Sequence, residues 1–263
     1  NHKLKKNLNI QINVIGAIIY HLFILKVFRN KFGFMGLFIE PFGLLFIFLM
    51  IRLPFSNSNE IANLDNVLFL STGILYLTFF RLSSIVPNMS YNSFAPLFNF
   101  RQIKPIDVFI STTFFEGAII IILYLTILLI MFFLRKEIII SDLGTLLNSF
   151  FLLSIINFSS SLFFKYCDYV MPFFRNLLPW IARILFFTSG TFFSLSAIPQ
   201  SIKPFLSWNP ILQSVEISRK ALDDQYVLDI EYISFKYLLI VTILFSFFML
   251  SIYGITENNL LKR

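Results

Sequence analysis

Residues 184–222 read ILFFTSGTFFSLSAIPQSIKPFLSWNPILQSVEISRKAL, and this stretch decides the fold. It begins as an apolar, membrane-type helix, and three prolines then divide a still-apolar segment into pieces too short to cross a bilayer. Asn209 and Pro210 suit an N-cap and a first helical position, so we expect a helix to restart there. Such a broken hairpin needs protein or a cavity around it, because lipid cannot satisfy its backbone. The pattern is typical of a channel or transporter gate, and a simple membrane anchor does not require it.

Composition defines the class of protein around this stretch. Of the 263 residues, 57% are hydrophobic and 13% are charged, whereas soluble domains carry about 25% charged residues. The chain is therefore expected to be an integral membrane protein. Its 36 phenylalanines fit a biased codon usage better than an aromatic-lined passage, because Gly and Ala are scarce. The single cysteine, Cys167, excludes an intramolecular disulfide.

Six apolar segments approach the length of about 20 residues that a spanning helix needs. They cover residues 34–51, 64–80, 108–134, 143–164, 177–197 and 233–255. With both termini in the cytoplasm, 13 basic residues fall on the cytoplasmic side and seven on the outside, as the positive-inside rule requires. The net charge of +7 therefore bears on topology and lipid headgroups, and no nucleic-acid partner is expected.

Residues 8–28 are apolar enough to form a seventh span, but polar residues recur along them at helical spacing. Lys6, Asn9, Asn13 and Tyr20 form a narrow stripe, which favours an amphipathic helix in the cytoplasmic interface. We therefore expect residues 1–32 to form this interfacial helix and residues 33–263 to form an all-α, six-helix membrane domain. No cleavable signal, internal repeat or soluble domain is expected.

Catalytic motifs are lacking in the sequence. It contains no Walker motif, no Gly-rich phosphate loop and no His/Cys cluster, and its two histidines, His2 and His21, have no metal-ligand partner at useful spacing. The acidic residues expected on the cytoplasmic side are isolated, so a metal-bound diphosphate site is not predicted. The chain is not expected to be an enzyme by itself, and energy for uphill transport must come from another subunit.

Three ionisable residues fall inside predicted spans, where such residues are functional candidates. Glu40 and Arg183 each lie about six residues into their helices, roughly 9 Å deep. Equal depth and opposite charge predict an ion pair or a shared polar wall, serving either helix register or the substrate path. Glu116 lies in the third span, either near the interface or protonated, and the sequence leaves the two alternatives open.

Several spaced motifs together resemble ABC-2-type permeases, especially exporters of capsular polysaccharide and other lipid-linked glycans. GFMGLFIEP at 33–41 resembles the start of their first span, and Asn92 followed by QIKPID at 102–107 resembles their cytoplasmic loop. SGTFFSLSAIP at 189–199, with the residues from Trp208 to Arg219, resembles their outer-gate hairpin. Phe34-Met35-Gly36 stands where Tyr-Leu-Trp is usual and His21 where arginine is common, which puts headgroup roles there in doubt.

The resemblance implies a homodimer in the bacterial inner membrane that works with two separate ABC ATPase subunits. ATP and Mg would be bound by those partners, and this chain would hold no cofactor or metal. A lipid-linked polysaccharide would pass between the protomers, and a periplasmic co-polymerase or adaptor and an outer-membrane export protein are compatible partners. Alternatives are an exporter of O-antigen, teichoic acid or a smaller lipid or drug and, from other classes, a membrane-embedded glycan-handling enzyme or a passive channel.

Three groups of site residues follow from the spans and the resemblance. The translocation path is expected along the first and fifth spans, with Glu40, Glu116, Arg183 and Phe187. ATPase coupling is expected in the loop 81–106 and just after it, with Tyr91 and Phe94 on the docking surface, together with Asn92, Lys104 and Asp107. A periplasmic gate of two short helices is expected over 199–222, with helix starts set by Pro199 and by Asn209-Pro210. Glu216 is expected to pair with Arg219 or Lys220. The predicted gate residues are Pro199, Trp208, Asn209, Pro210, Glu216 and Arg219.

Overall fold

The structure is a computed structural model that describes residues 2–28, 33–52, 60–61, 64–100, 102–134 and 140–260. Within these ranges the regular structure is helical apart from one short antiparallel pair of strands, so the predicted all-α class is confirmed. Some basic residues that were counted for the cytoplasmic side lie outside the described residues: Arg29, Lys31, Arg101, Lys262 and Arg263.

The bounds of the long helices and the strands are α1 His2–Val27, α2 Gly36–Arg52, β1 Glu60–Ile61, β2 Leu64–Asp65, α3 Asn66–Phe80, α5 Pro105–Phe133, α6 Leu143–Val170 and α10 Phe235–Leu260. Five of the long helices, α2, α3, α5, α6 and α10, follow predicted apolar segments closely. The shorter elements are η1 Gly33–Met35, η3 Arg81–Ile85, α4 Val86–Met89, η4 Tyr91–Asn99, η5 Pro172–Leu177, α7 Leu178–Thr188, η6 Leu195–Ala197, α8 Lys203–Ser207 and α9 Pro210–Leu222. The segment η3 is π-helical and joins α3 to α4 without a break.

Five helical stretches of the described chain are long and apolar enough to cross a membrane. They are Ile10–Val27, Asn66–Met89, Pro105–Phe133, Leu143–Val170 and Phe235–Glu257, with Gly36–Ile51 as a shorter apolar helix. The predicted fifth span is shorter than expected, because α7 ends at Thr188 and Gly190 follows with a φ of 69°. Residues 8–28, expected in the interface, contain one of the five stretches.

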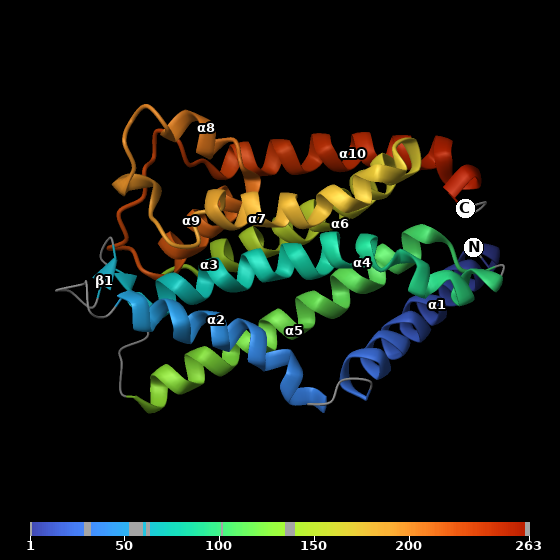
Figure 1. The fold of residues 1–263 in the computed structure, drawn as a ribbon, viewed down its shortest axis with the longest axis horizontal. Coiled ribbons are helices and arrows are strands. Elements are labelled where there is room, and N and C mark those ends of the chain that lie inside the picture. Colours follow the sequence, from blue (N-terminus) through green and yellow to red (C-terminus); the bar gives the residue numbers. More distant parts are fainter. Residues whose placement is uncertain are drawn as a thin grey trace.

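The helices form an elongated bundle in which the start of the first helix and the end of the last helix lie at the same end (Figure 1). The N-terminal end of α1 and the C-terminal end of α10 lie there beside α4 and the connection from α6 to α7. The strand pair and helices α8 and α9 lie at the opposite end (Figure 1). The bundle therefore has one end that carries both termini and the predicted coupling loop, and another that carries the predicted gate.

Helix α9 is too short to span a membrane and is buried almost completely among α3, α6 and α10. Its apolar residues Ile211, Leu212 and Val215 lie in the core. Its polar residues are buried as well, and Ser218 donates to the hydroxyl of Tyr76 (2.8 Å) and lies 2.6 Å from that of Ser149. The surrounding helices thus provide the protein environment that the broken segment was expected to need.

Two helices occupy the predicted gate segment, but only one of them begins where the sequence predicted. Asn209 caps α9, its side-chain oxygen accepting from the backbone of Ile211 at 3.0 Å, as predicted. Pro199 does not begin a helix. A turn follows it instead, and α8 begins at Lys203 with Pro204 in its first turn.

Candidate functional site

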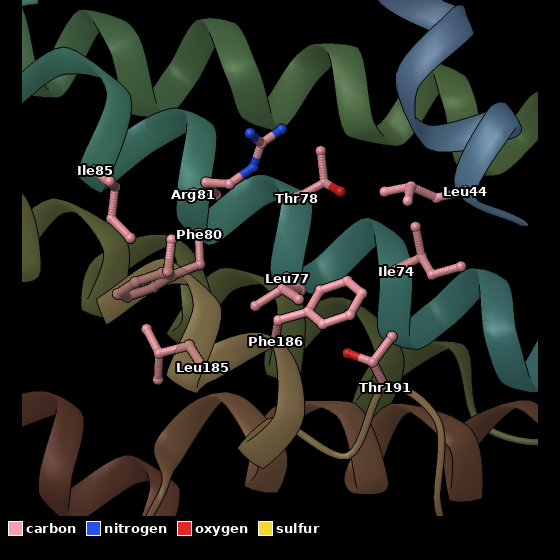
Figure 2. Close-up of a pocket in the computed structure, with 11 residues that line it drawn as sticks. Leu44, Ile74, Leu77, Thr78, Phe80, Arg81, Ile85, Leu185, Phe186 and Thr191 are labelled. Carbon is pink, nitrogen blue, oxygen red and sulfur yellow. The ribbon is translucent and has the colours of Figure 1, made fainter. Parts of the chain in front are cut away.

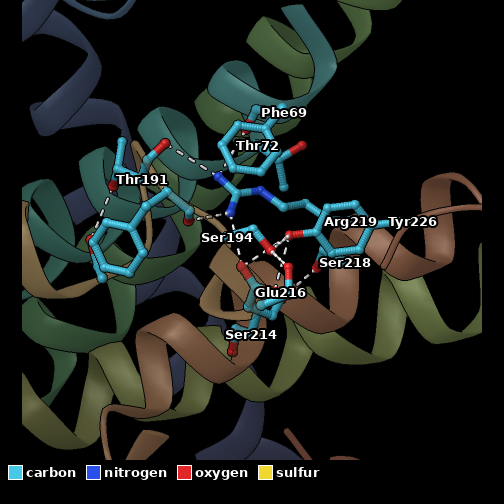
Figure 3. A network of polar contacts seen from close by, with 12 residues as sticks. Phe69, Thr72, Thr191, Ser194, Ser214, Glu216, Ser218, Arg219 and Tyr226 are labelled. Atoms are coloured by element: carbon cyan, nitrogen blue, oxygen red, sulfur yellow. Dashed lines mark hydrogen bonds and ion pairs between the residues drawn. The ribbon is translucent and has the colours of Figure 1, made fainter. Parts of the chain in front are cut away.

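A buried arginine holds the predicted gate helix against the rest of the bundle (Figure 3). The guanidinium of Arg219 in α9 donates to the carbonyl of Phe69 in α3 at 3.0 Å and to that of Thr191 at 3.2 Å. It also lies 3.4 Å from the ring centroid of Phe69, a cation–π contact. Its other terminal nitrogen donates to the carbonyl of Phe193 at 3.3 Å. One fully buried side chain therefore joins α3, α9 and the loop that follows α7.

The charge of Arg219 is balanced by Glu216 one turn earlier, which confirms the predicted pair. The two side chains are fully buried and 3.0 Å apart. The hydroxyl of Tyr226 donates to both carboxylate oxygens of Glu216 at 3.0 and 3.1 Å, and Ser194 lies beside it (Figure 3). Burial raises the pKa of the Glu216 carboxyl, while the facing guanidinium opposes that shift. The Arg219–Glu216–Tyr226 network thus ties the loop after α9 to the same point.

The remaining predicted gate residues lie away from this network. Trp208 is 76% exposed, and Pro199 is exposed as well. The side chain of Asn209 donates to the carbonyl of Thr188 at 3.2 Å and so connects α9 to the end of α7. The predicted gate therefore divides into a buried network and an exposed rim.

The predicted first and fifth spans, α2 and α7, lie against each other. Phe48 of α2 packs on Phe186 and Phe192, with ring centroids 6.0 and 4.1 Å away. A cavity of about 40 Å³ remains between α2, α3 and α7, where Phe186 faces Ile74 and Leu77 (Figure 2). The two helices proposed to border the path are thus neighbours in one chain.

The outer side of α7 carries the other predicted path residues. Arg183 is exposed, with its guanidinium 4.7 Å from the ring centroid of Trp180. Phe187, one turn further on, is 68% exposed. A cation and two aromatic rings therefore share an outward-facing surface of α7, which can contact sugar rings and anionic groups.

The predicted pairing of Glu40 with Arg183 is wrong within the chain. Glu40 forms an ion pair with Arg81 of η3, and the buried Glu116 pairs with Lys26 of α1 at 2.6 Å. Lys26 and Glu40 also line a cavity of about 430 Å³ between α1, α2, α3 and α5. Glu40 lies on the side of α2 that meets Arg81, whereas Arg183 faces outward.

The predicted coupling segment, α4 with η4, is anchored by the residues expected to form its docking surface. Tyr91 stacks on Phe98 and Phe109, with ring centroids 5.4 and 6.0 Å away. Phe94 packs in a cluster that includes Ile18 of α1 and Val108 of α5. Both rings are buried, which corrects their predicted role. The exposed side of the segment is formed instead by Met89, Asn92, Ser93, Ala95, Pro96, Asn99 and Phe100.

Lys104 and Asp107 fix the end of this segment. The backbone N–H of Lys104 donates to the carboxylate of Asp107 at 2.9 Å, and Gln11 of α1 donates to the same carboxylate. The ammonium of Lys104 pairs with Glu257 of α10 at 2.8 Å, and this contact raises the pKa of Lys104. The two residues therefore join α1, α5 and α10 at the end that carries the termini.

Sequence reasoning missed four residues that these sites depend on. Arg81 and Lys26 entered only as topogenic charges, although each pairs with an intramembrane acid. Gly73 is an isolated glycine in an apolar helix, a pattern that often marks close packing, and Arg219 lies beside it. Tyr226 gave no signal in the sequence. Among the described residues, no group of three or more His, Cys, Asp and Glu could hold a metal ion.

The fold and these sites define an all-helical protein with helices of membrane-spanning length and internally paired charges, with the α4–η4 segment at one end and a buried short helix at the other. The polysialic acid transport protein KpsM of Escherichia coli is 29% identical over 89% of each chain. The capsule polysaccharide export inner-membrane protein BexB of Haemophilus influenzae is 24% identical over 88% of this chain and 87% of its own. CtrC of Neisseria meningitidis serogroup B, which has the same description as BexB, is 25% identical over 81% and 80%.

No family model matches the chain. The pairwise similarities nevertheless extend over most of its length and over a comparable share of each relative. The predicted resemblance to proteins of capsular polysaccharide export is therefore confirmed.

Replacing Gly73 with alanine tests the packing around Arg219. An added Cβ would lie 2.7 Å from the Cα of Thr191 and 2.9 Å from the guanidinium of Arg219, so we expect a loss of about 1–3 kcal/mol in stability. Gly254→Ala in α10 is the matched control, because no heavy atom lies within 4 Å of its added Cβ. Thermal unfolding of the purified variants measures the difference. Equal melting of Gly73→Ala and the parent would show that the close contact does not constrain the fold.

Proposed function

We propose that the chain is the inner-membrane permease subunit of an ATP-driven exporter of capsular polysaccharide. One observation carries the proposal: nearly 90% of the chain aligns with a comparable share of two relatives that are named for polysialic acid transport and capsule polysaccharide export. The helical bundle with its five long apolar stretches is consistent with a membrane permease. The cargo is proposed to be lipid-linked, and another bacterial glycan is the alternative.

The proposed roles of the subunits follow from the residues and elements that lie at each end of the bundle. Two ABC ATPase subunits are proposed to bind ATP and Mg and to dock on the exposed side of α4–η4. Two copies of the chain form the permease, and the α2–α7 surface with Arg183 and Phe187 faces the polymer between them. Helix α1 is proposed to lie in the cytoplasmic interface, where the ion pair of Lys26 with Glu116 attaches it to α5. With α1 in the interface, and with α7 and the loop that follows it as the fifth crossing, the proposed topology has six spans and two cytoplasmic termini.

The predicted periplasmic gate is proposed to be α8, α9 and the loops attached to them. In the described state α9 fills the space between α3, α6 and α10 at the end far from the termini. Opening the exit would require this helix to move relative to α3, and the Arg219–Glu216–Tyr226 network opposes that movement. A channel without a partner ATPase would need no coupling between the two ends, so ATP-dependent opening distinguishes the two classes.

A charge on the exposed side of α4–η4 tests the proposed ATPase docking. Ala95→Asp adds a carboxylate where no buried contact is disturbed, and we expect co-purification of the ATPase subunit to fall by about tenfold. Ala197→Asp is the matched control, since Ala197 is exposed in η6 at the opposite end. Tyr91→Asp and Phe94→Asp should instead lower the amount of folded protein, because both rings are buried. If Ala95→Asp left co-purification of the ATPase subunit unchanged, this surface would not be the docking site.

Removing the charge of Arg183 tests the proposed path. Arg183→Leu should reduce surface delivery of an anionic capsule by about tenfold, the value of one charge-assisted hydrogen bond. Because Glu40 is paired with Arg81, adding Glu40→Leu should not restore export. Lys236→Leu, an exposed cation at the start of α10, is the control. Recovery of export in the double variant would show that Arg183 acts only by balancing Glu40.

A further inference from the structure

A second polar cavity lies between the coupling segment and the bend that follows α6. It measures about 330 Å³ and is lined by Tyr91 of η4, Lys165 and Asp168 of α6, and Arg175 of η5. It is separate from the cavity beside Lys26 and Glu40 and from the surface of α7. None of the roles proposed above uses its charges.

The cavity has an excess of positive charge. Arg175 donates to the carboxylate of Asp168 at 2.7 Å, and the ammonium of Lys165 lies 3.8 Å from the same oxygen. Lys165 also lies 3.5 Å from the ring centroid of Tyr91. Two cations therefore share one carboxylate, which leaves a net charge of about +1 in a partly dehydrated space, where an anion is attracted more strongly than in water.

Two of the residues that line the cavity carry a buried hydrogen-bond donor without a partner. Tyr91 is only 6% exposed, and its hydroxyl has no hydrogen-bond partner among the described residues. Burial raises the pKa of Tyr91, so the hydroxyl keeps its proton and can donate. The Nε of Arg175 is likewise buried without a partner within the described chain. Unsatisfied buried donors are costly, so rotation of either side chain toward an anion in the cavity would be favoured.

The position of the cavity favours an anion that belongs to a lipid. The apolar stretch Asn66–Met89 ends two residues before Tyr91, and the stretch Leu143–Val170 ends at the same bend. Next to the cavity, the apolar side chains of Val170, Met171 and Phe173 are each more than half exposed. Charge at the end of two spans, flanked by exposed apolar side chains, suits a headgroup with its acyl chains alongside.

We propose that this cavity binds the phosphate of an anionic phospholipid of the cytoplasmic leaflet. The hydroxyl of Tyr91 and the cations Lys165 and Arg175 would contact the phosphate oxygens, and the acyl chains would lie along the exposed side of η5. The bound lipid would join the coupling segment to the α6–α7 bend. This inference rests on the chain lying in a membrane and does not depend on the exported substrate, so its failure would leave the proposed function in place.

The test compares the full chain and three variants in lipid. Each is reconstituted with phosphatidylcholine alone or with added phosphatidylglycerol, and retained lipid is counted by native mass spectrometry beside thermal unfolding. Tyr91→Phe removes only the hydroxyl, and Arg175→Gln removes one charge. Each should retain about tenfold less phosphatidylglycerol than the parent chain. Lys236→Gln, which removes an exposed charge at the opposite end, should retain the parental amount.

The arms of the experiment separate the possible sources of the anion. Stabilisation of the parent chain by phosphatidylglycerol and not by soluble glycerol 3-phosphate supports the lipid site. Equal stabilisation by both probes would assign the cavity to a soluble phosphate and overturn the lipid assignment. Equal lipid retention by all four proteins would show that these residues bind no lipid. If Arg175→Gln lost the ATPase subunit but kept its lipid, the cavity would belong to the protein partner instead.

Discussion

The contact between Arg219 and Glu216 is the interaction on which the packing of α9 inside this bundle depends. Both side chains are fully buried, and removing one partner of such a pair typically costs about 3–5 kcal/mol. The two terminal nitrogens of the guanidinium donate to three backbone carbonyls from α3 and the loop after α7, as well as to Glu216. These contacts can form only because residue 73 lacks a side chain. They hold α9, too short to span a membrane, inside a bundle of longer helices.

The two ends of the molecule use charge in different ways. At the end with α9, Arg219 and Glu216 are fully buried and paired with each other, which favours one fixed arrangement. At the end with the termini, the pair of Lys104 with Glu257 connects α5 to α10 and remains partly exposed. Exposed pairs are individually weak, so this end can exchange partners more easily. That difference is consistent with a regulated exit at one end and a docking surface at the other.

Much of the fold was predictable because it depends on quantities that the sequence carries directly. The lengths of the apolar segments predicted the long helices, and the residue types at 209 and 210 predicted the Asn209 cap. The spacing of residues along one helix predicted the pair of Glu216 with Arg219. The same reasoning failed where the direction of a side chain around its helix mattered. Glu40 and Arg183 were placed at similar depths, but their side chains face different neighbours. Tyr91 and Phe94 were taken as exposed because an amphipathic segment does not show which side is covered.

The central claim is that α9 closes the exit at rest and moves when the partner ATPase works. The most direct test replaces the fully buried Ser214 with cysteine in a chain in which Cys167 is serine, with Trp208→Cys as an exposed control. A bulky aqueous thiol reagent should label the control in every state. It should label position 214 poorly at rest and strongly when ATP hydrolysis is trapped in the reconstituted complex. Strong labelling of position 214 at rest, or no increase on trapping, would contradict the account.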